Sequence, residues 1–170
     1  VLLTAHRREN WGEPMKDIFA AVKELVTKNQ DVNVIFPMHK NPLIRELANE
    51  SFKGIEDKIH LIEPLEYVDF ANLMAKCYLI MTDSGGIQEE APALGKPVIV
   101  LRTETERPEA VKAGTVKLAG IKKADIFNIA DELINDEEAY NKMAHAVNPY
   151  GDGKACPRIV EHIVEYFKNK

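Results

Sequence analysis

The sequence lacks the features that would place it in several common functional classes. It has two cysteines in 170 residues, Cys77 and Cys156, and their spacing fits neither a disulfide framework nor a metal site. No apolar run approaches the roughly 20 residues that a membrane-spanning helix needs. The formal net charge of −5 disfavours a general nucleic-acid-binding surface, which is normally basic. We therefore expect a protein of the reducing cytoplasm with no membrane or nucleic-acid partner.

Several catalytic and targeting motifs are also missing. The chain contains no Gly-x-Ser-x-Gly turn, no Cys-x-x-Cys pair, no histidine pair at zinc-ligand spacing and no signal or lipidation motif. We accordingly predict no metal and no resident cofactor. The chain does not begin with methionine, and residues 1–4 already have the pattern of a buried strand. This start predicts a piece of a longer protein.

The sequence does contain a regular alternation of short apolar runs and amphipathic stretches. Because apolar strands separated by helices are typical of a parallel sheet covered on both faces, we predict an α/β fold. It would be a single Rossmann-like, doubly wound parallel sheet domain that spans residues 1–170 without an internal linker. The predicted strands are residues 1–5, 32–38, 59–62, 78–82, 98–101 and 116–118. The predicted helices are residues 14–29, 42–52, 67–76, 87–94, a short helix after 105, 124–135, 137–146 and about 156–168.

Charged residues follow the predicted strands, at the edge where doubly wound sheets bind ligands. His-Arg-Arg-Glu-Asn (6–10) follows the first strand, and His-Lys (39–40) follows the second. Four of the six arginines, at positions 7, 8, 102 and 107, fall in these loops. Guanidinium groups bind anions well, so this concentration in an acidic chain predicts an anion site. The first loop taken alone is equally consistent with a solvated charged surface, and a lone histidine such as His39 is more often structural, although two histidines at parallel positions make that less so.

The fourth predicted strand is followed by a Ser-Gly-Gly turn (84–86) and a helix. Glycine lets the backbone approach a ligand closely, and the free N–H groups of a helix start attract phosphate. Glu90, one helical turn after Gly86, is placed to accept hydrogen bonds from ribose hydroxyls. The alternatives are a simple tight turn and, for Glu90, compensation of the helix dipole. Phe70 has two interpretations, a platform for a planar base or a core residue, and its residue type favours the core.

Four segments, read together, carry a resemblance to a known family. They are Thr-Ala-His-Arg-Arg-Glu-Asn (4–10), Pro-Met-His-Lys-Asn-Pro (37–42), Asp-Ser-Gly-Gly-Ile-Gln-Glu-Glu-Ala-Pro (83–92) and Thr-Glu-Arg-Pro-Glu (105–109). Their content and order closely resemble the non-hydrolysing UDP-N-acetylglucosamine 2-epimerases over nearly the whole chain. The resemblance implies the carboxyl-terminal half of a glycosyltransferase-B fold, in which two Rossmann-like domains enclose the active site. The amino-terminal half, absent from this chain, would be its partner, and the full-length enzyme would be a homodimer.

The resemblance also assigns residues to the nucleotide. It implies that Ser84, Gly85 and Gly86 cradle the diphosphate of UDP and that Glu90 binds the ribose hydroxyls. Phe70 matches the position that packs on uracil, against the preference drawn from its residue type.

Four further positions match residues near the sugar or a second ligand. The resemblance implies that His6 and Arg107 lie near the diphosphate and the reacting sugar, with His6 as the catalytic candidate. Arg7 and His39 match positions that, in bacterial members, contact a second UDP-N-acetylglucosamine acting as an allosteric activator.

The implied reaction interconverts UDP-N-acetylglucosamine and UDP-N-acetylmannosamine through elimination and re-addition of UDP, a step in polysaccharide biosynthesis. The family's catalytic carboxylates belong to the amino-terminal half, so we expect this chain to bind UDP weakly and not to turn over. Two alternatives remain open: the nucleotide-binding domain of a UDP-sugar glycosyltransferase, and a stand-alone nucleotide-binding module. The intact His-Arg-Arg-Glu-Asn and Thr-Glu-Arg-Pro-Glu segments favour the epimerase.

Overall fold

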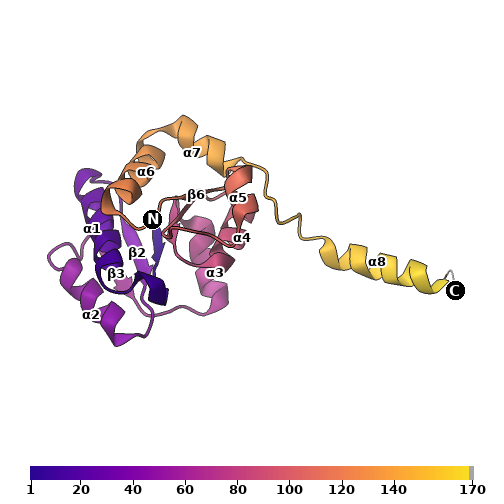
Figure 1. The fold of residues 1–170 in the computed structure, drawn as a ribbon, viewed down its shortest axis with the longest axis horizontal. Helices are drawn as coiled ribbons and strands as arrows, with labels where there is room; N and C mark the ends of the chain where they lie inside the picture. Colours follow the sequence, from indigo (N-terminus) through magenta and orange to yellow (C-terminus); the bar gives the residue numbers. More distant parts are fainter. Residues whose placement is uncertain (169–170) are drawn as a thin grey trace.

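Six short parallel strands form one sheet at the centre of the molecule (Figure 1). The computed structural model of the chain describes residues 1–168. The sheet order is β3-β2-β1-β4-β5-β6, and each neighbouring pair is parallel. The strands are β1 (Leu2–Thr4), β2 (Val34–Pro37), β3 (Ile59–Ile62), β4 (Ile80–Thr82), β5 (Val98–Val100) and β6 (Val116–Leu118). The predicted doubly wound parallel sheet is confirmed, with its change of winding direction between β1 and β4.

Eight α-helices and one short 3-10 helix are found in the described part of the chain. They are η1 (Arg8–Asn10), α1 (Glu13–Lys28), α2 (Pro42–Ser51), α3 (Tyr67–Lys76), α4 (Gly85–Ala93), α5 (Pro108–Ala113), α6 (Lys123–Asn135), α7 (Glu137–Ala144) and α8 (Ala155–Lys168). Most bounds agree with the prediction, but α4 begins at Gly85 and not at the predicted residue 87. Glycine disfavours helix interiors, which is why the pattern placed the start too late; Ser84 has extended geometry and serves as the N-cap.

The two faces of the sheet are covered by different helices (Figure 1). Leu3 belongs to the core formed with α1, α2 and α6, whereas its neighbour Leu2 belongs to the core formed with α3, α4 and α5. Successive strand residues point to opposite faces, and both leucines are 0% exposed. Full burial of such a side chain contributes about 2 kcal/mol. The two cores hold the strand ends in place and so position the loops of the ligand-binding edge.

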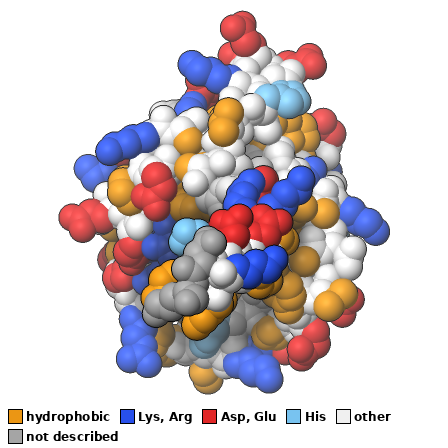
Figure 2. Space-filling view, turned by 90° about the vertical axis from the view of Figure 1, so that its right-hand side faces the viewer, with side chains coloured by type: hydrophobic (Ala, Val, Ile, Leu, Met, Phe, Trp, Pro, Cys, Tyr) orange, Lys and Arg blue, Asp and Glu red, His pale blue; other side chains and the backbone are white. Residues whose placement is uncertain are grey.

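Helix α8 stands away from the rest of the molecule (Figure 1). Residues 151–168 are all exposed, and the chain reaches α8 through a turn in which Gly151 and Gly153 both have positive φ. The prediction of a chain without a linker did not anticipate this separation. Seen from the side on which α8 projects, the surface carries charged side chains of both signs close together (Figure 2). In residues 1–168, no helix has both the length and the apolar character required to cross a membrane.

Candidate functional site

The loops after β1 and β4 lie side by side because their strands are paired in register. Thr4 pairs with Thr82, and the hydroxyl oxygens of these two residues are 2.5 Å apart. The carboxyl ends of parallel strands meet at the same edge of the sheet. The pairing therefore brings the His-Arg-Arg segment next to the Ser-Gly-Gly turn, although almost eighty residues separate them along the chain.

Asp83, the first residue after β4, joins the two loops. Its Oδ2 atom accepts hydrogen bonds from the backbone N–H groups of His6 and Arg7, both at 2.8 Å, and from Nδ2 of Asn10 at 3.2 Å. The Asp83 backbone N–H donates to the carbonyl oxygen of Thr4 at 3.2 Å. Sequence reasoning gave Asp83 no role of its own. The available signal was a carboxylate directly after a strand, at the same edge as three basic residues.

The ring of His6 pairs with the other carboxylate oxygen of Asp83. His6 Nδ1 lies 3.1 Å from Asp83 Oδ1, an ion-pair distance, and within residues 1–168 that buried oxygen accepts no hydrogen bond of regular geometry. The Asp83 side chain is 0% exposed and that of His6 is 41% exposed. The hydrogen bond to Asp83 raises the pKa of His6, outweighing burial. Burial alone would raise the pKa of Asp83, but hydrogen bonds from the His6 ring and the Arg7 backbone lower it overall.

A cavity of about 410 Å³ opens beside this histidine. It brings together four of the predicted site residues, His6, His39, Phe70 and Ser84. The rings of His6 and His39 are stacked, with centroids 5.9 Å apart. Phe70 packs partly against the second core and also lines the cavity, so its position is compatible with both roles considered for it. The lining of the cavity therefore combines apolar residues with basic and hydroxyl groups.

The Ser-Gly-Gly turn has room for a Cβ atom at both glycines at the start of α4. A Cβ atom added to Gly85 would lie 3.8 Å from Arg7 Nη2, and one added to Gly86 would lie 3.9 Å from Glu90 Oε1. Both distances are ordinary van der Waals contacts, and neither glycine has positive φ. Neither the backbone conformation nor the neighbouring atoms thus require glycine at these positions. Close approach of a ligand to the free N–H groups would account for both.

Glu90 lies one turn along α4 and outside the cavity lining. Its Oε2 atom accepts a hydrogen bond of 3.2 Å from the hydroxyl of Tyr67, the first residue of α3. The negative charge of Glu90 raises the pKa of Tyr67. Tyr67 is a neighbour that sequence reasoning missed, because nothing in the sequence places the start of α3 beside α4.

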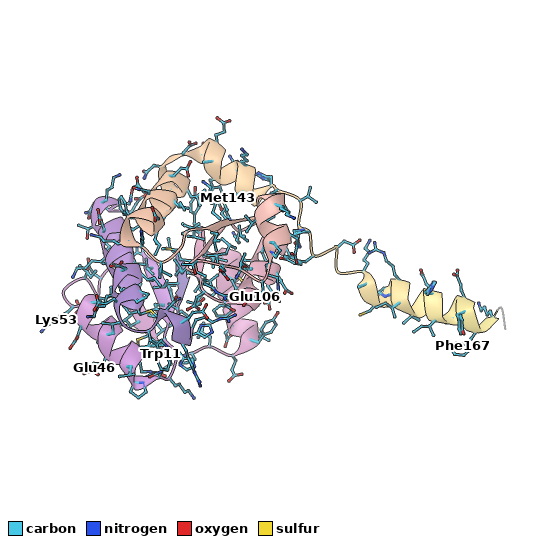
Figure 3. The ribbon with its side chains drawn as sticks, in the orientation of Figure 1. Trp11, Glu46, Lys53, Glu106, Met143 and Phe167 are labelled. Atoms are coloured by element: carbon cyan, nitrogen blue, oxygen red, sulfur yellow. The ribbon has the colours of Figure 1, made fainter. Side chains whose placement is uncertain are left out.

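Three of the arginines at this edge, Arg7, Arg102 and Arg107, are paired with carboxylates. Arg102, which is almost buried, forms ion pairs with Glu9 at 2.8 Å and with Glu106 at 2.6 Å. Arg7 lies 3.8 Å from the same Glu106. The hydrogen bond from Arg102 lowers the pKa of Glu106 to about 2. Figure 3 shows that Glu106 lies in the body of the molecule, far from Phe167 on α8. Their gathering was predicted, but the acidic partners were not.

Arg107, at the start of α5, is outside the cavity lining and is held from two directions. Its Nε atom donates to Glu89, and its backbone N–H donates to Oγ1 of Thr105 at 3.0 Å. The Thr105 hydroxyl donates to Oε1 of the buried Gln88 at 2.5 Å, and Gln88 Nε2 donates to the carbonyl oxygen of Ser84 at 3.1 Å. This chain of hydrogen bonds links the loop before α5 to the Ser-Gly-Gly turn. In residues 1–168, no group of three or more His, Cys, Asp and Glu side chains is arranged to hold a metal.

Known proteins are similar to this chain over most of its length. A family model described as UDP-N-acetylglucosamine 2-epimerase matches residues 1–164. The UDP-N-acetylglucosamine 2-epimerase of Bacillus subtilis is 55% identical over 98% of this chain, and that of Escherichia coli K12 is 50% identical over 95%. The matches cover 44% and 43% of those two proteins. The chain thus spans less than half the length of the curated relatives it matches.

Solved structures of proteins from the same family have folds similar to that of this chain. A putative UDP-N-acetylglucosamine 2-epimerase from Listeria monocytogenes has a TM-score of 0.93 at 51% identity, over 99% of this chain and 45% of that one. The Staphylococcus aureus MnaA–UDP structure has a TM-score of 0.92 at 55% identity, over 98% and 46%. A glycosyl transferase carboxyl-terminal domain from Francisella tularensis, at 15% identity and a TM-score of 0.71, shares the fold alone. The chain belongs to the UDP-N-acetylglucosamine 2-epimerase family.

Proposed function

We propose that this chain is the UDP-binding part of an enzyme that interconverts UDP-N-acetylglucosamine and UDP-N-acetylmannosamine. The observation that carries the proposal is the convergence of His6, Phe70 and Ser84 on one cavity at the carboxyl edge of the sheet. The S. aureus structure is described as a complex with UDP, and a Neisseria meningitidis relative at 49% identity as bound to UDP-GlcNAc. Family membership favours this function over that of a glycosyltransferase or a stand-alone module.

The site would hold UDP through three kinds of contact. The diphosphate would lie at the start of α4, where the N–H groups after Ser84 are free to donate and two glycines allow close approach. The uracil would pack on Phe70. The ribose hydroxyls would donate to Glu90, whose carboxylate lies close to Gly86. Arg107, at the start of α5, would add positive charge to the diphosphate side.

In the whole enzyme, this part would act on the leaving group. Elimination places the departing negative charge on the diphosphate, and oriented N–H groups together with a histidine and an arginine stabilise such charge in a site that excludes water. His6, on the cavity wall, would be the catalytic group contributed by this chain. The carboxylates for acid–base work at C2 would come from residues outside the chain.

Other parts of the proposal concern partners. Arg7 and His39 would contact a second UDP-N-acetylglucosamine that acts as an allosteric activator. The stacking of His39 on His6 supports this, because a ligand that moves one ring would also shift the other. The remainder of the enzyme would complete the active site, and the full-length protein would work as a homodimer in the cytoplasm.

Calorimetric titration with UDP tests the binding site. We expect Glu90→Ala to weaken UDP binding at least about tenfold, because a hydrogen bond to a charged group contributes about 1.5–3 kcal/mol. The matched control is Glu161→Ala, which removes the same charge from exposed α8 and should bind UDP like the wild type. Equal affinity of wild type and Glu90→Ala, or no binding of UDP to the wild type at millimolar concentration, would contradict the proposal.

A further inference from the structure

The geometry points to Asp83 as a positioning residue: its carboxylate holds His6 by Nδ1 and leaves Nε2 of the same ring for a diphosphate oxygen of the bound nucleotide. The inference rests on the proposed function for the identity of the ligand. The Asp83 carboxylate does not line the cavity. Without this role it would serve only to hold the loop after β1 in place.

The Asp83 side chain is fully buried, so both of its oxygen atoms need partners. A fully buried carboxylate is costly unless each oxygen has a partner. Oδ2 has three donors, from His6, Arg7 and Asn10. Those three bonds would be enough to anchor the loop. Oδ1 is different, because within the described residues it accepts no hydrogen bond of regular geometry, and His6 Nδ1, 3.1 Å away, is its one ion-pair contact. The second oxygen is therefore dedicated to the ring.

The contact between the Asp83 carboxylate and the His6 ring determines which ring nitrogen of neutral His6 carries the proton. An ionised carboxylate can only accept hydrogen bonds, so the proton of neutral His6 must sit on Nδ1. The two ring nitrogens lie on different sides of the imidazole, so Nε2 is directed away from Asp83. His6 lines the cavity that Ser84 also lines. A diphosphate oxygen also only accepts, and Nε2 can therefore donate to it only when His6 is an imidazolium.

Asp83 favours that imidazolium. The hydrogen bond to its carboxylate raises the pKa of His6, so the charged form persists to higher pH than for an unpaired histidine. The other charged or titratable groups that face His6 are Arg7 in its own loop, which opposes the effect, and His39 and Lys40 after β2, which share the cavity. Asp83 is the one acidic group among them.

Two substitutions separate this role from simple anchoring. Asp83→Asn keeps an oxygen for the backbone donors but presents an N–H₂ group to His6 Nδ1, which forces the opposite tautomer and removes the charge. Asn10→Ala removes one of the donors to Asp83 Oδ2 and leaves the His6 pair in place. A purely structural role predicts the same effects from both substitutions. A positioning role predicts an altered histidine only in Asp83→Asn.

The experiment combines nitrogen-15 NMR of the histidine rings with UDP calorimetry from pH 5.5 to 8.5. In the wild type we expect neutral His6 to carry its proton on Nδ1 and to titrate above the ordinary value of about 6.5. In Asp83→Asn we expect the proton on Nε2 and a lower pKa. At pH 7 its UDP affinity should fall several-fold, because the neutral ring still donates from Nε2 but lacks the positive charge that strengthens such a bond, and its pH profile should be flatter. Asn10→Ala should keep the wild-type profile, and His6→Gln gives the baseline set by ionisation of UDP itself.

The possible results are distinguishable. A proton on Nε2 in the neutral wild type would overturn the inference, and this measurement decides it even if Asp83→Asn does not fold. Identical pH profiles for wild type and Asp83→Asn would also overturn it while UDP binding itself stands. If Asn10→Ala and Asp83→Asn change the His6 pKa and the pH profile of UDP affinity equally, Asp83 only holds the loop in place and does not position the ring. Failure of the wild type to bind UDP would instead overturn the proposed function.

Discussion

Gly85 and Gly86 differ from the other glycines of the chain in their backbone conformation. The remaining seven of the nine glycines all have positive φ, a backbone conformation that residues with a Cβ atom rarely adopt. Gly85 and Gly86 lie in the first turn of α4 without positive φ. An alanine would fit this backbone and touch its neighbours only at ordinary distances. The absence of side chains here is thus best explained by a ligand that is proposed to occupy the space.

The substitution Gly86→Ala separates folding from binding. We expect the free energy of unfolding to stay the same or to rise by up to about 1 kcal/mol, since alanine is the better helix former. UDP affinity should fall at least about tenfold, because the new methyl group would occupy the position of the diphosphate. Urea unfolding and calorimetry measure the two quantities. Unchanged UDP affinity would mean that the ligand does not approach this backbone closely.

At the scale of elements, the loop between β5 and α5 is held to α4 by the Thr105 hydroxyl group and by the ion pair of Arg107 with Glu89. Thr105 Oγ1 donates to the buried Gln88 and accepts from the backbone N–H of Arg107. Thr105→Val has nearly the same shape but leaves Gln88 Oε1 without this donor. We expect it to lower the free energy of unfolding by about 1–3 kcal/mol and to weaken UDP binding, because the start of α5 is released.

Thr105→Ser is the matched control for this link. It keeps the hydroxyl group and loses only a methyl group, so its stability and UDP affinity should remain close to those of the wild type. Chemical unfolding and calorimetry of both variants check the prediction. If Thr105→Val has the stability and UDP affinity of the wild type, the hydrogen bonds of the hydroxyl group do not hold this loop.

The same elements show what the sequence can and cannot predict. Alternating apolar and amphipathic segments located all six strands to within about two residues at most ends, because hydrophobic periodicity is a local property. The pairing of β1 with β4 is not local, and neither is the contact between His6 and Asp83 that depends on it. For this reason Asp83, Tyr67 and the distant acidic partners Glu9 and Glu89 were missed. The motifs grouped the predicted site residues correctly around one edge, but their roles in binding remain predictions.

At the scale of the whole molecule, the described residues form a well-packed sheet domain and one helix that covers nothing. The apolar side chains of α8 are between 43% and 69% exposed; they are Ile159, Val160, Ile163, Val164, Tyr166 and Phe167. The cavity at the edge of the sheet is likewise open on one side. Both features fit a chain that spans less than half the length of its curated relatives.

The composition of the cavity wall predicts that this chain alone has no epimerase activity. The lining has His6, His39 and Lys40 as its ionisable residues and contains no aspartate or glutamate from residues 1–168. The proposed elimination needs a base at C2 of the sugar, and His6 is expected to hold its charge because the pKa is raised. UDP-N-acetylglucosamine incubated with the chain in D₂O should therefore keep its C2–H signal in proton NMR and give no UDP-N-acetylmannosamine. The full-length B. subtilis relative, assayed in parallel, serves as the positive control. Deuterium at C2 with this chain alone would place the base among these residues, and loss of that exchange in His6→Gln would then identify it.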